Sequence, residues 1–94
     1  MDMGMTTISD NPDRSRFELT EDGHTAFANY RRQGAVLLIP HVEAPPALRG
    51  KGTAGRLLEG VAAHARAHGL KIEPICSYAA AWFHRHREYG DLLA

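Results

Sequence analysis

A basic, glycine-rich loop that leads into an amphipathic helix constrains this chain more than any other feature. It occupies residues 48–58, with the sequence LRGKGTAGRLL. Glycines let the backbone approach a ligand closely, and the first amides of a helix have no carbonyl partner within the helix. Such amides, together with a basic side chain, suit an anion such as a phosphate. The sequence therefore predicts an anion site where the loop meets the helix.

Length and composition bound the class of protein. At 94 residues we expect one domain, formed by residues 10–94, with a disordered N-terminus over residues 1–9. The 11 basic and 11 acidic residues cancel, so no net field favours nucleic acid or an anionic membrane. The apolar run 35–39 is too short to span a bilayer, and one cysteine cannot form an internal disulfide. The start of the chain lacks the pattern of a signal peptide, so we expect a cytoplasmic protein, as a monomer or weak homodimer.

The first part of the chain has the pattern of antiparallel strands. Residues 10–13 have turn chemistry, and residues 16–20 then alternate polar and apolar, as a half-buried strand does. Residues 21–23 end in Asp-Gly, which favours the positive φ of a hairpin turn. Residues 24–30 alternate again, and we expect Phe27 to point inward. Residues 31–34 predict a second turn.

A nearly continuous apolar run over residues 35–42 predicts a central strand that contains a proline. Because proline has no N–H to donate, Pro40 indicates an edge, a bulge or a place where pairing with the next strand fails. A bulge at Pro40 would open the sheet.

The second part of the chain predicts a helix, a strand and a helix. The first helix has one apolar face and ends at Gly69; the face consists of Leu57, Leu58, Val61, Ala62 and Ala65. Residues 70–76 predict a strand, and Ser77 is a natural N-cap for a helix over 78–86. Three antiparallel strands followed by a helical crossover to a fourth strand predict an α+β fold with one parallel pair.

Two common phosphate-binding motifs fit the loop poorly. Residues 50–55 match the dinucleotide fingerprint G-x-G-x-x-G, but that fold needs repeated strand-helix-strand units on a parallel sheet. In a Walker loop the lysine is followed by serine or threonine, whereas Lys51 is followed by Gly52.

A third pattern covers the loop together with other segments. Residues 49–54, RGKGTA, resemble the R/Q-x-x-G-x-G/A segment with which Gcn5-related N-acetyltransferases (GNAT) bind the pyrophosphate of coenzyme A. Segments 10–12, 41–45, 74–78 and 85–89 also resemble very small members of that superfamily, the YjdJ-like and NATD1-like acetyltransferases. The resemblance implies a compact GNAT-like α+β fold with a splayed sheet, acetyl-CoA as cofactor and an amine as acceptor. It implies cofactor contacts from Val42, Arg49, Gly50, Lys51, Gly52, Thr53 and Ala54.

Three residues are candidates for the chemistry of acetyl transfer. Glu43 follows the central strand and is either the base that accepts the proton of the amine or a solvated carboxylate. Cys76 ends the last strand as a nucleophile, a pocket contact or, as we favour, core filler. If Cys76 is core, Cys76→Ser should lower the melting temperature. By resemblance to larger relatives, Tyr78 could donate a proton to the departing thiolate.

Several other residues have simpler interpretations. Trp82 and Phe83 are expected in the core. His64 and His68 lie four residues apart on a helix without a third ligand at motif spacing, so we expect a solvated face and no metal. The basic segment 84–87 either contacts the adenosine phosphate of the cofactor or complements a helix C-terminus.

Three functions are consistent with the sequence. The first is an acetyltransferase in which the amine attacks acetyl-CoA directly. The second is a binding module that holds coenzyme A or an acyl-CoA with little turnover. The third treats residues 50–55 as a structural turn without a ligand.

Overall fold

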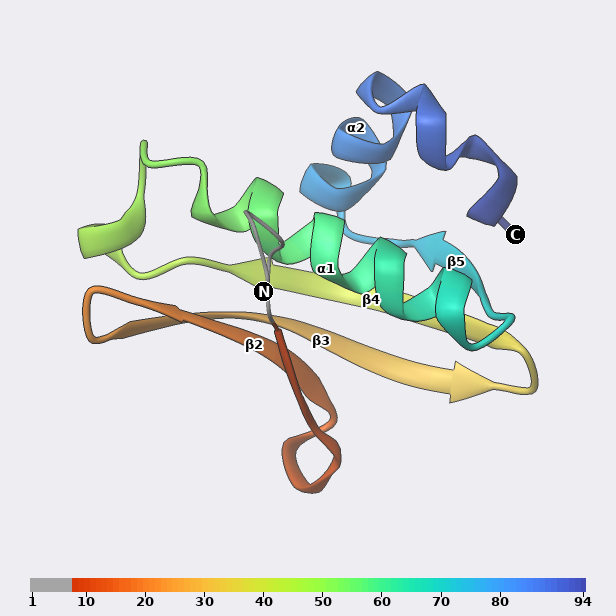
Figure 1. Ribbon diagram of the computed structural model, residues 1–94, viewed down its shortest axis with the longest axis horizontal. Coiled ribbons are helices and arrows are strands. Elements are labelled where there is room, and N and C mark those ends of the chain that lie inside the picture. Colours follow the sequence, from red (N-terminus) through yellow and green to blue (C-terminus); the bar gives the residue numbers. More distant parts are fainter. Residues whose placement is uncertain (1–7) are drawn as a thin grey trace, which may run out of the picture.

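The computed structural model describes residues 8–94 and has the predicted order of antiparallel strands, helix, strand and helix (Figure 1). The elements are β1 (Ser9–Asn11), β2 (Arg16–Glu21), β3 (His24–Gln33), β4 (Val36–Glu43), α1 (Thr53–Ala67), β5 (Lys71–Pro74) and α2 (Ser77–Arg85). Short 3₁₀ helices occupy Pro12–Arg14, Pro46–Leu48 and Arg87–Leu92. No helix within residues 8–94 is long and apolar enough to cross a membrane.

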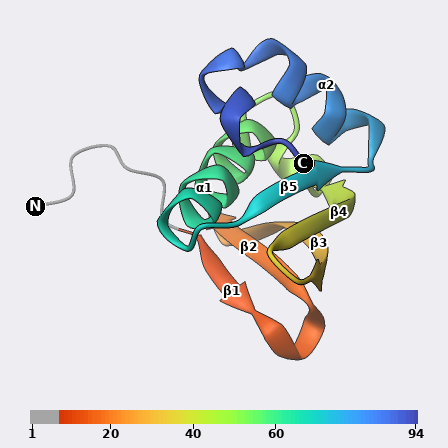
Figure 2. The ribbon, with the colours of Figure 1, turned by 90° about the vertical axis from the view of Figure 1, so that its right-hand side faces the viewer.

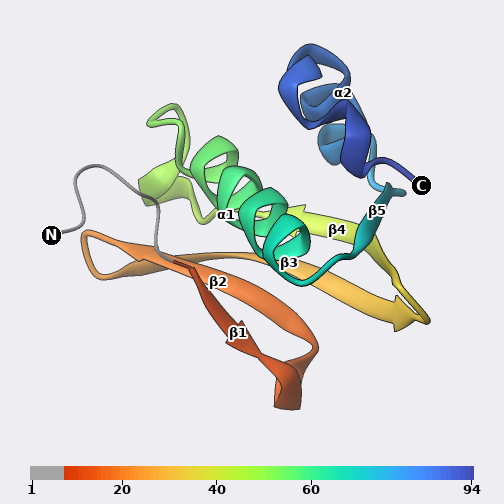
Figure 3. The same ribbon diagram turned by 45° about the vertical axis from the view of Figure 1, so that its right-hand side comes forward.

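The strands form one mixed sheet in the order β1-β2-β3-β4-β5. The first four strands are antiparallel, and β4 pairs with β5 in parallel through the α1 crossover. Figure 2 shows β1 and β5 at opposite edges of the sheet, and Figure 3 shows α1 across one face with α2 beyond β5 on the same side. The predicted α+β fold is confirmed. The strand β1 is additional to the prediction.

The core lies between α1 and the face of the sheet that it covers. All five apolar helix residues predicted to be on one face are buried, as are Trp82 and Phe83 of α2. The sheet contributes buried side chains from its alternating inward positions: Phe17, Leu19, Ala26, Ala28, Leu37, Ile39 and Ile72. This burial stabilises the fold by about 25 cal/mol for each Å² of apolar surface removed from water.

The expectation that Phe27 points inward is wrong. Ala26 and Ala28 are the buried residues of this part of β3, so alternation places Phe27 on the face away from α1. There the Arg16 guanidinium lies 4.3 Å from the centre of the Phe27 ring and shields it from water. Small residues on β3 suit a sheet whose helix packs closely above it.

The predicted turns form, but the second hairpin turn is shorter than predicted. Asp22 and Gly23 have φ of 52° and 76°, so the Asp-Gly hairpin forms as predicted. Gly69 has φ of 68° and ends α1 in the left-handed conformation. The turn predicted over residues 31–34 is shorter, because β3 continues through Gln33 and only Gly34 and Ala35 separate it from β4.

The N-terminal prediction falls mostly outside the described residues, which begin at Ile8. Ile8 packs against the core, and Ser9 begins β1. Gly60 makes room for Ile8, because a Cβ at Gly60 would lie 2.5 Å from the Ile8 Cγ2 atom.

The packing of His64 predicts a loss of stability in mild acid. Burial lowers the pKa of His64, and the adjacent charge of His68 lowers it further. An unfolded histidine has a pKa of about 6.5, so below that pH the unfolded chain binds more protons than the folded one. The melting temperature should therefore fall as the pH is lowered from about 7 to about 5, and His64→Gln should flatten this decline. The pKa of Glu21 in the folded protein is about 2, so protonation of Glu21 lowers stability only below the pH range of about 7 to 5. If the melting temperature of His64→Gln falls as steeply with pH as that of the wild type, other titrating groups cause the decline.

Candidate functional site

The site begins where β4 loses its parallel partner. On β4 the three steps from Leu38 to His41 oppose only two on β3, which places a bulge at Ile39 and Pro40. Pairing with β5 ends at Ile39, whose carbonyl accepts hydrogen bonds from the amides of Ile75 (3.0 Å) and Cys76 (3.1 Å). Beyond the bulge, residues 41–43 of β4 pair with β3 alone among the described strands. The predicted bulge and splay are therefore present.

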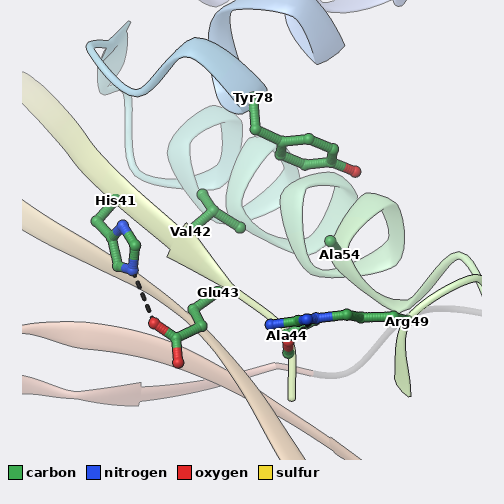
Figure 4. A pocket seen from close by; sticks show the side chains of 7 residues that line it. All are labelled: His41, Val42, Glu43, Ala44, Arg49, Ala54 and Tyr78. Atoms are coloured by element: carbon green, nitrogen blue, oxygen red, sulfur yellow. Dashed lines mark hydrogen bonds and ion pairs between the residues drawn. The ribbon is translucent and has the colours of Figure 1, made fainter. Parts of the chain in front are cut away.

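Two adjoining hollows open beside this edge of β4. The larger has a volume of about 500 Å³, within the range of small-molecule sites. Figure 4 shows its lining: His41, Val42, Glu43, Ala44, Arg49, Ala54 and Tyr78. The smaller, of about 230 Å³, shares four of these residues and adds Leu48, Gly50, Gly52 and Thr53. The hollows bring together eight of the ten predicted site residues; Lys51 and Cys76 lie beside them.

The loop before α1 leaves a helix N-terminus without a side-chain cap. Gly52 is the N-cap residue, and it and Gly50 have φ of 79° and 78°, which glycine adopts readily. The first hydrogen bond of the helix runs from the Arg56 amide to the Gly52 carbonyl, at 3.1 Å. The amides of residues 52–55 therefore have no acceptor within the helix and are free to bind an anion.

Arg49 adds positive charge at the wall shared by the two hollows. Its Nε donates to the Ala44 carbonyl at 3.1 Å, which holds the side chain alongside Ala44 in the lining of the larger hollow (Figure 4). The two terminal guanidinium nitrogens make no hydrogen bond to the part of the chain that the structure describes. They can therefore donate to an anion.

The side chains of Lys51 and Thr53 point to the β2–β3 turn. The Lys51 Nζ lies 3.4 Å from the Asp22 carboxylate, with both side chains more than half exposed. Thr53 is buried, and its hydroxyl donates to Glu21 at 2.6 Å. In this arrangement the contribution of Thr53 to an anion is its backbone amide.

His41 is a site residue that the sequence interpretation missed. Its Nε2 lies 2.9 Å from the Glu43 carboxylate, and both side chains are about half exposed. In Figure 4 this pair and Val42 project to opposite sides of β4. The i, i+2 spacing of a histidine and a glutamate on one strand was the available signal. A carboxylate that orients an imidazole is an arrangement suited to accepting a proton.

Tyr78, in the first turn of α2, lies on the other side of the opening. The residue lines both hollows and is 41% exposed (Figure 4). Trp82, one turn further along α2, lies close to the first turn of α1: its Nε1 would be 3.2 Å from a Cβ on Gly55.

Cys76 is half-buried, packs against the core and precedes α2 as its N-cap. The prediction that Ser77 is the N-cap is therefore wrong by one residue, because Ser77 is already helical. The Cys76 side chain makes no capping hydrogen bond. Its role as nucleophile stays a hypothesis.

The N-cap position changes the expected result of Cys76→Ser. Serine is among the best N-cap residues, and a capping bond contributes about 1 kcal/mol, so the melting temperature should be unchanged or higher. If Cys76 only packs, turnover should fall less than tenfold. Loss of turnover by orders of magnitude, together with an acetylated cysteine in the wild type, would instead identify a nucleophile.

Three further histidines make packing contacts. The His64 ring stacks on His68 at 4.2 Å and meets the edge of Phe17 at 4.9 Å. His86 stacks on Trp82 at 3.9 Å, and its Nδ1 lies 2.8 Å from the Trp82 carbonyl near the C-terminus of α2. No group of three or more potential metal ligands occurs within residues 8–94.

Comparison with known proteins identifies the family. Residues 16–92 match the family model described as GCN5-related N-acetyl-transferase, a range that contains both hollows. No curated protein matches the chain. Four solved chains match the structure, among them the solution NMR structure of a GCN5-like protein from Staphylococcus aureus, a candidate N-acetyltransferase. It is 27% identical with a TM-score of 0.73, and the match covers 98% of this chain and 91% of that one.

The narrower resemblance to YjdJ-like and NATD1-like proteins stays a prediction. The family model spans 77 of the 94 residues, from the start of β2 to the closing 3₁₀ helix. The chain therefore belongs to the GCN5-related N-acetyltransferase family.

Proposed function

We propose that this protein binds acetyl-CoA and transfers the acetyl group to an amine. One observation carries the proposal: the edge of β4 that pairs with no described strand and the uncapped N-terminus of α1 both border the larger hollow, and the smaller hollow continues along that N-terminus. The first offers backbone hydrogen bonds to an extended chain, and the second offers amides to an anion. Coenzyme A combines these two features in its pantetheine arm and its pyrophosphate.

The residues present suit this cofactor. The amides of residues 52–55 and the guanidinium of Arg49 would hold the pyrophosphate, with Lys51 adding positive charge nearby. The backbone of residues 41–43 would pair with the amide groups of the pantetheine arm. Val42 and Ala54 are small enough to leave the larger hollow open between these two parts.

The bound cofactor supplies an acetyl group activated as a thioester. An alkylamine has a pKa of about 10.4 and is mostly protonated at neutral pH, so a base must take a proton before the nitrogen can attack. Glu43, with His41 2.9 Å away, would accept that proton. As the new N–C bond forms and the C–S bond breaks, the nitrogen releases its second proton to solvent. The Tyr78 hydroxyl would donate a proton to the departing sulfur and regain one from solvent.

Release of free thiol tests the function. The purified protein is mixed with acetyl-CoA and a panel of small amines and lysine peptides, and the thiol is measured over time against a no-protein control. The proposal predicts amine-dependent release. Binding of coenzyme A in calorimetry with no release for any acceptor would favour a binding module, and no binding at all would contradict the proposed function.

A further inference from the structure

A cluster of three side chains lies against the anion loop, and only Thr53 among them borders a hollow. Glu21, the last residue of β2, accepts from the Nε and Nη2 of Arg56 at 2.8 Å each and from the Thr53 hydroxyl at 2.6 Å. We call Glu21, Thr53 and Arg56 the brace. It joins β2 to the first turn of α1 across more than 30 positions of sequence.

The brace also holds the loop backbone. The Arg56 Nη2 donates to the Lys51 carbonyl at 3.0 Å, and the Nη1 would lie 3.2 Å from a Cβ on Gly52. The guanidinium therefore lies against both residues that precede α1. From the same hairpin, Asp22 reaches the Lys51 ammonium at 3.4 Å.

The anchor of the brace is itself rigid and charged. Glu21 is followed by the tight Asp22-Gly23 turn, which fixes the end of β2. Hydrogen bonds from Arg56 and Thr53 lower the pKa of Glu21 to about 2, so the carboxylate is ionised at neutral pH. Its charge balances that of Arg56, which leaves Arg49 to attract the ligand.

We propose that Glu21 and Arg56 are positioning residues that hold the anion loop in its binding conformation before the ligand arrives. The proposal rests on the proposed function, because the anion is taken to be the pyrophosphate of coenzyme A. A loop with glycines at positions 50 and 52 has many accessible conformations, and ordering it on binding would weaken affinity. Bonds formed in the free protein remove that cost.

Glu21→Gln tests the brace by whether the Kd for coenzyme A rises or falls. The amide keeps the shape of the side chain but cannot accept both hydrogen bonds from Arg56. If the brace orders the loop, the calorimetric Kd for coenzyme A should rise about tenfold, and in turnover the KM for acetyl-CoA should rise with little change in kcat. If Glu21 only neutralises Arg56, removing the negative charge should tighten binding instead. A tighter or unchanged Kd would overturn the proposal.

Glu18→Gln is the matched control. Glu18 lies on the same strand and is paired with Arg16 at 2.7 Å, with both side chains 22% exposed. The pair lies beside Phe27 on the face away from α1, so its loss should change the melting temperature comparably but leave the Kd unchanged. An equal rise in Kd in both variants would show a general effect of stability and would contradict a specific role.

A second variant and a ligand-free measurement complete the test. Arg56→Lys keeps the positive charge but cannot donate two parallel hydrogen bonds to Glu21, so it should also raise the Kd for coenzyme A. This variant replaces Glu21→Gln in the test if Glu21→Gln does not fold. Amide hydrogen exchange in the free protein should accelerate at Lys51 and Arg56, whose amides donate to the Leu48 and Gly52 carbonyls, in either variant and not in Glu18→Gln. Unchanged exchange there would overturn the brace even if coenzyme A bound, whereas failure of the wild type to bind coenzyme A would overturn the proposed function alone.

Discussion

Replacing Ala54 with aspartate should abolish coenzyme A binding and leave the protein folded. Ala54 is the second residue of α1 and borders both hollows, so the new carboxylate would stand where the pyrophosphate is proposed to bind. Two like charges about 4 Å apart repel by roughly 4 kcal/mol near a protein surface, and each 1.4 kcal/mol is a factor of ten. The Kd should therefore rise on the order of 100-fold or more. An acidic residue in the first turn favours the helix itself.

Ala54→Asn is the control, because asparagine has the shape of aspartate without its charge. It should weaken binding by less than tenfold. Gly52 is less suitable for this test, since its φ of 79° would strain any other residue and confuse a loss of binding with a change of loop structure. Equal losses in the two Ala54 variants would attribute the effect to size, and an unchanged Kd in a folded Ala54→Asp protein would contradict the anion site.

Glu43→Gln should lower turnover by about 100-fold or more while coenzyme A still binds. Glutamine keeps the shape of the side chain but cannot accept the proton of the attacking amine, and general-base catalysis contributes typically 10²–10⁴-fold. His41→Gln should cause a loss of similar order if the two side chains act as one unit, and the double variant should then lose little more. Turnover is measured as thiol release at saturating acetyl-CoA.

Glu59→Gln controls for the loss of a carboxylate, because Glu59 is exposed on α1 away from the residues that line the hollows. Its turnover should match the wild type. Full activity in Glu43→Gln would mean that Glu43 is a solvated carboxylate, the interpretation that the sequence leaves open. Loss of activity in His41→Gln alone would make the imidazole the base and Glu43 its support.

Local chemistry made much of the fold predictable. The Asp-Gly turn needs positive φ at neighbouring residues, and Asp22 and Gly23 have it. Pro40 lacks an N–H, and the bulge with the end of β4–β5 pairing occurs beside it. The apolar spacing of α1 identified its buried face because a helix on a sheet buries a single stripe. Each of these signals depends only on residues close in sequence.

Features that depend on distant contacts were missed. Alternation along β3 defines two faces, but only the position of α1 shows that Ala26 and Ala28, not Phe27, face the core. β1 has three residues and exists through its pairing with β2, so its short sequence has no strand pattern of its own. The end of β3 is extended by pairing with β4, which overrides the turn expected there.

The same distinction holds for the site. The loop, Val42, Glu43 and Tyr78 were predictable from a motif and its resemblance, and they border the two hollows. The brace was not, because Glu21 and Arg56 are 35 positions apart and each is an ordinary charged residue in its own segment. His41 was overlooked because its i, i+2 spacing from Glu43 gains meaning only when both side chains are seen to line the larger hollow.

Chemical-shift mapping by NMR tests the central claim most directly. The ¹⁵N-labelled protein is titrated with coenzyme A, and every amide is followed. The account predicts saturable shifts concentrated at residues 41–44, 49–55 and around Tyr78, with the amides of 52–55 moving most. Shifts confined to another surface, such as the basic segment 84–87, or no shifts at millimolar ligand, would contradict it.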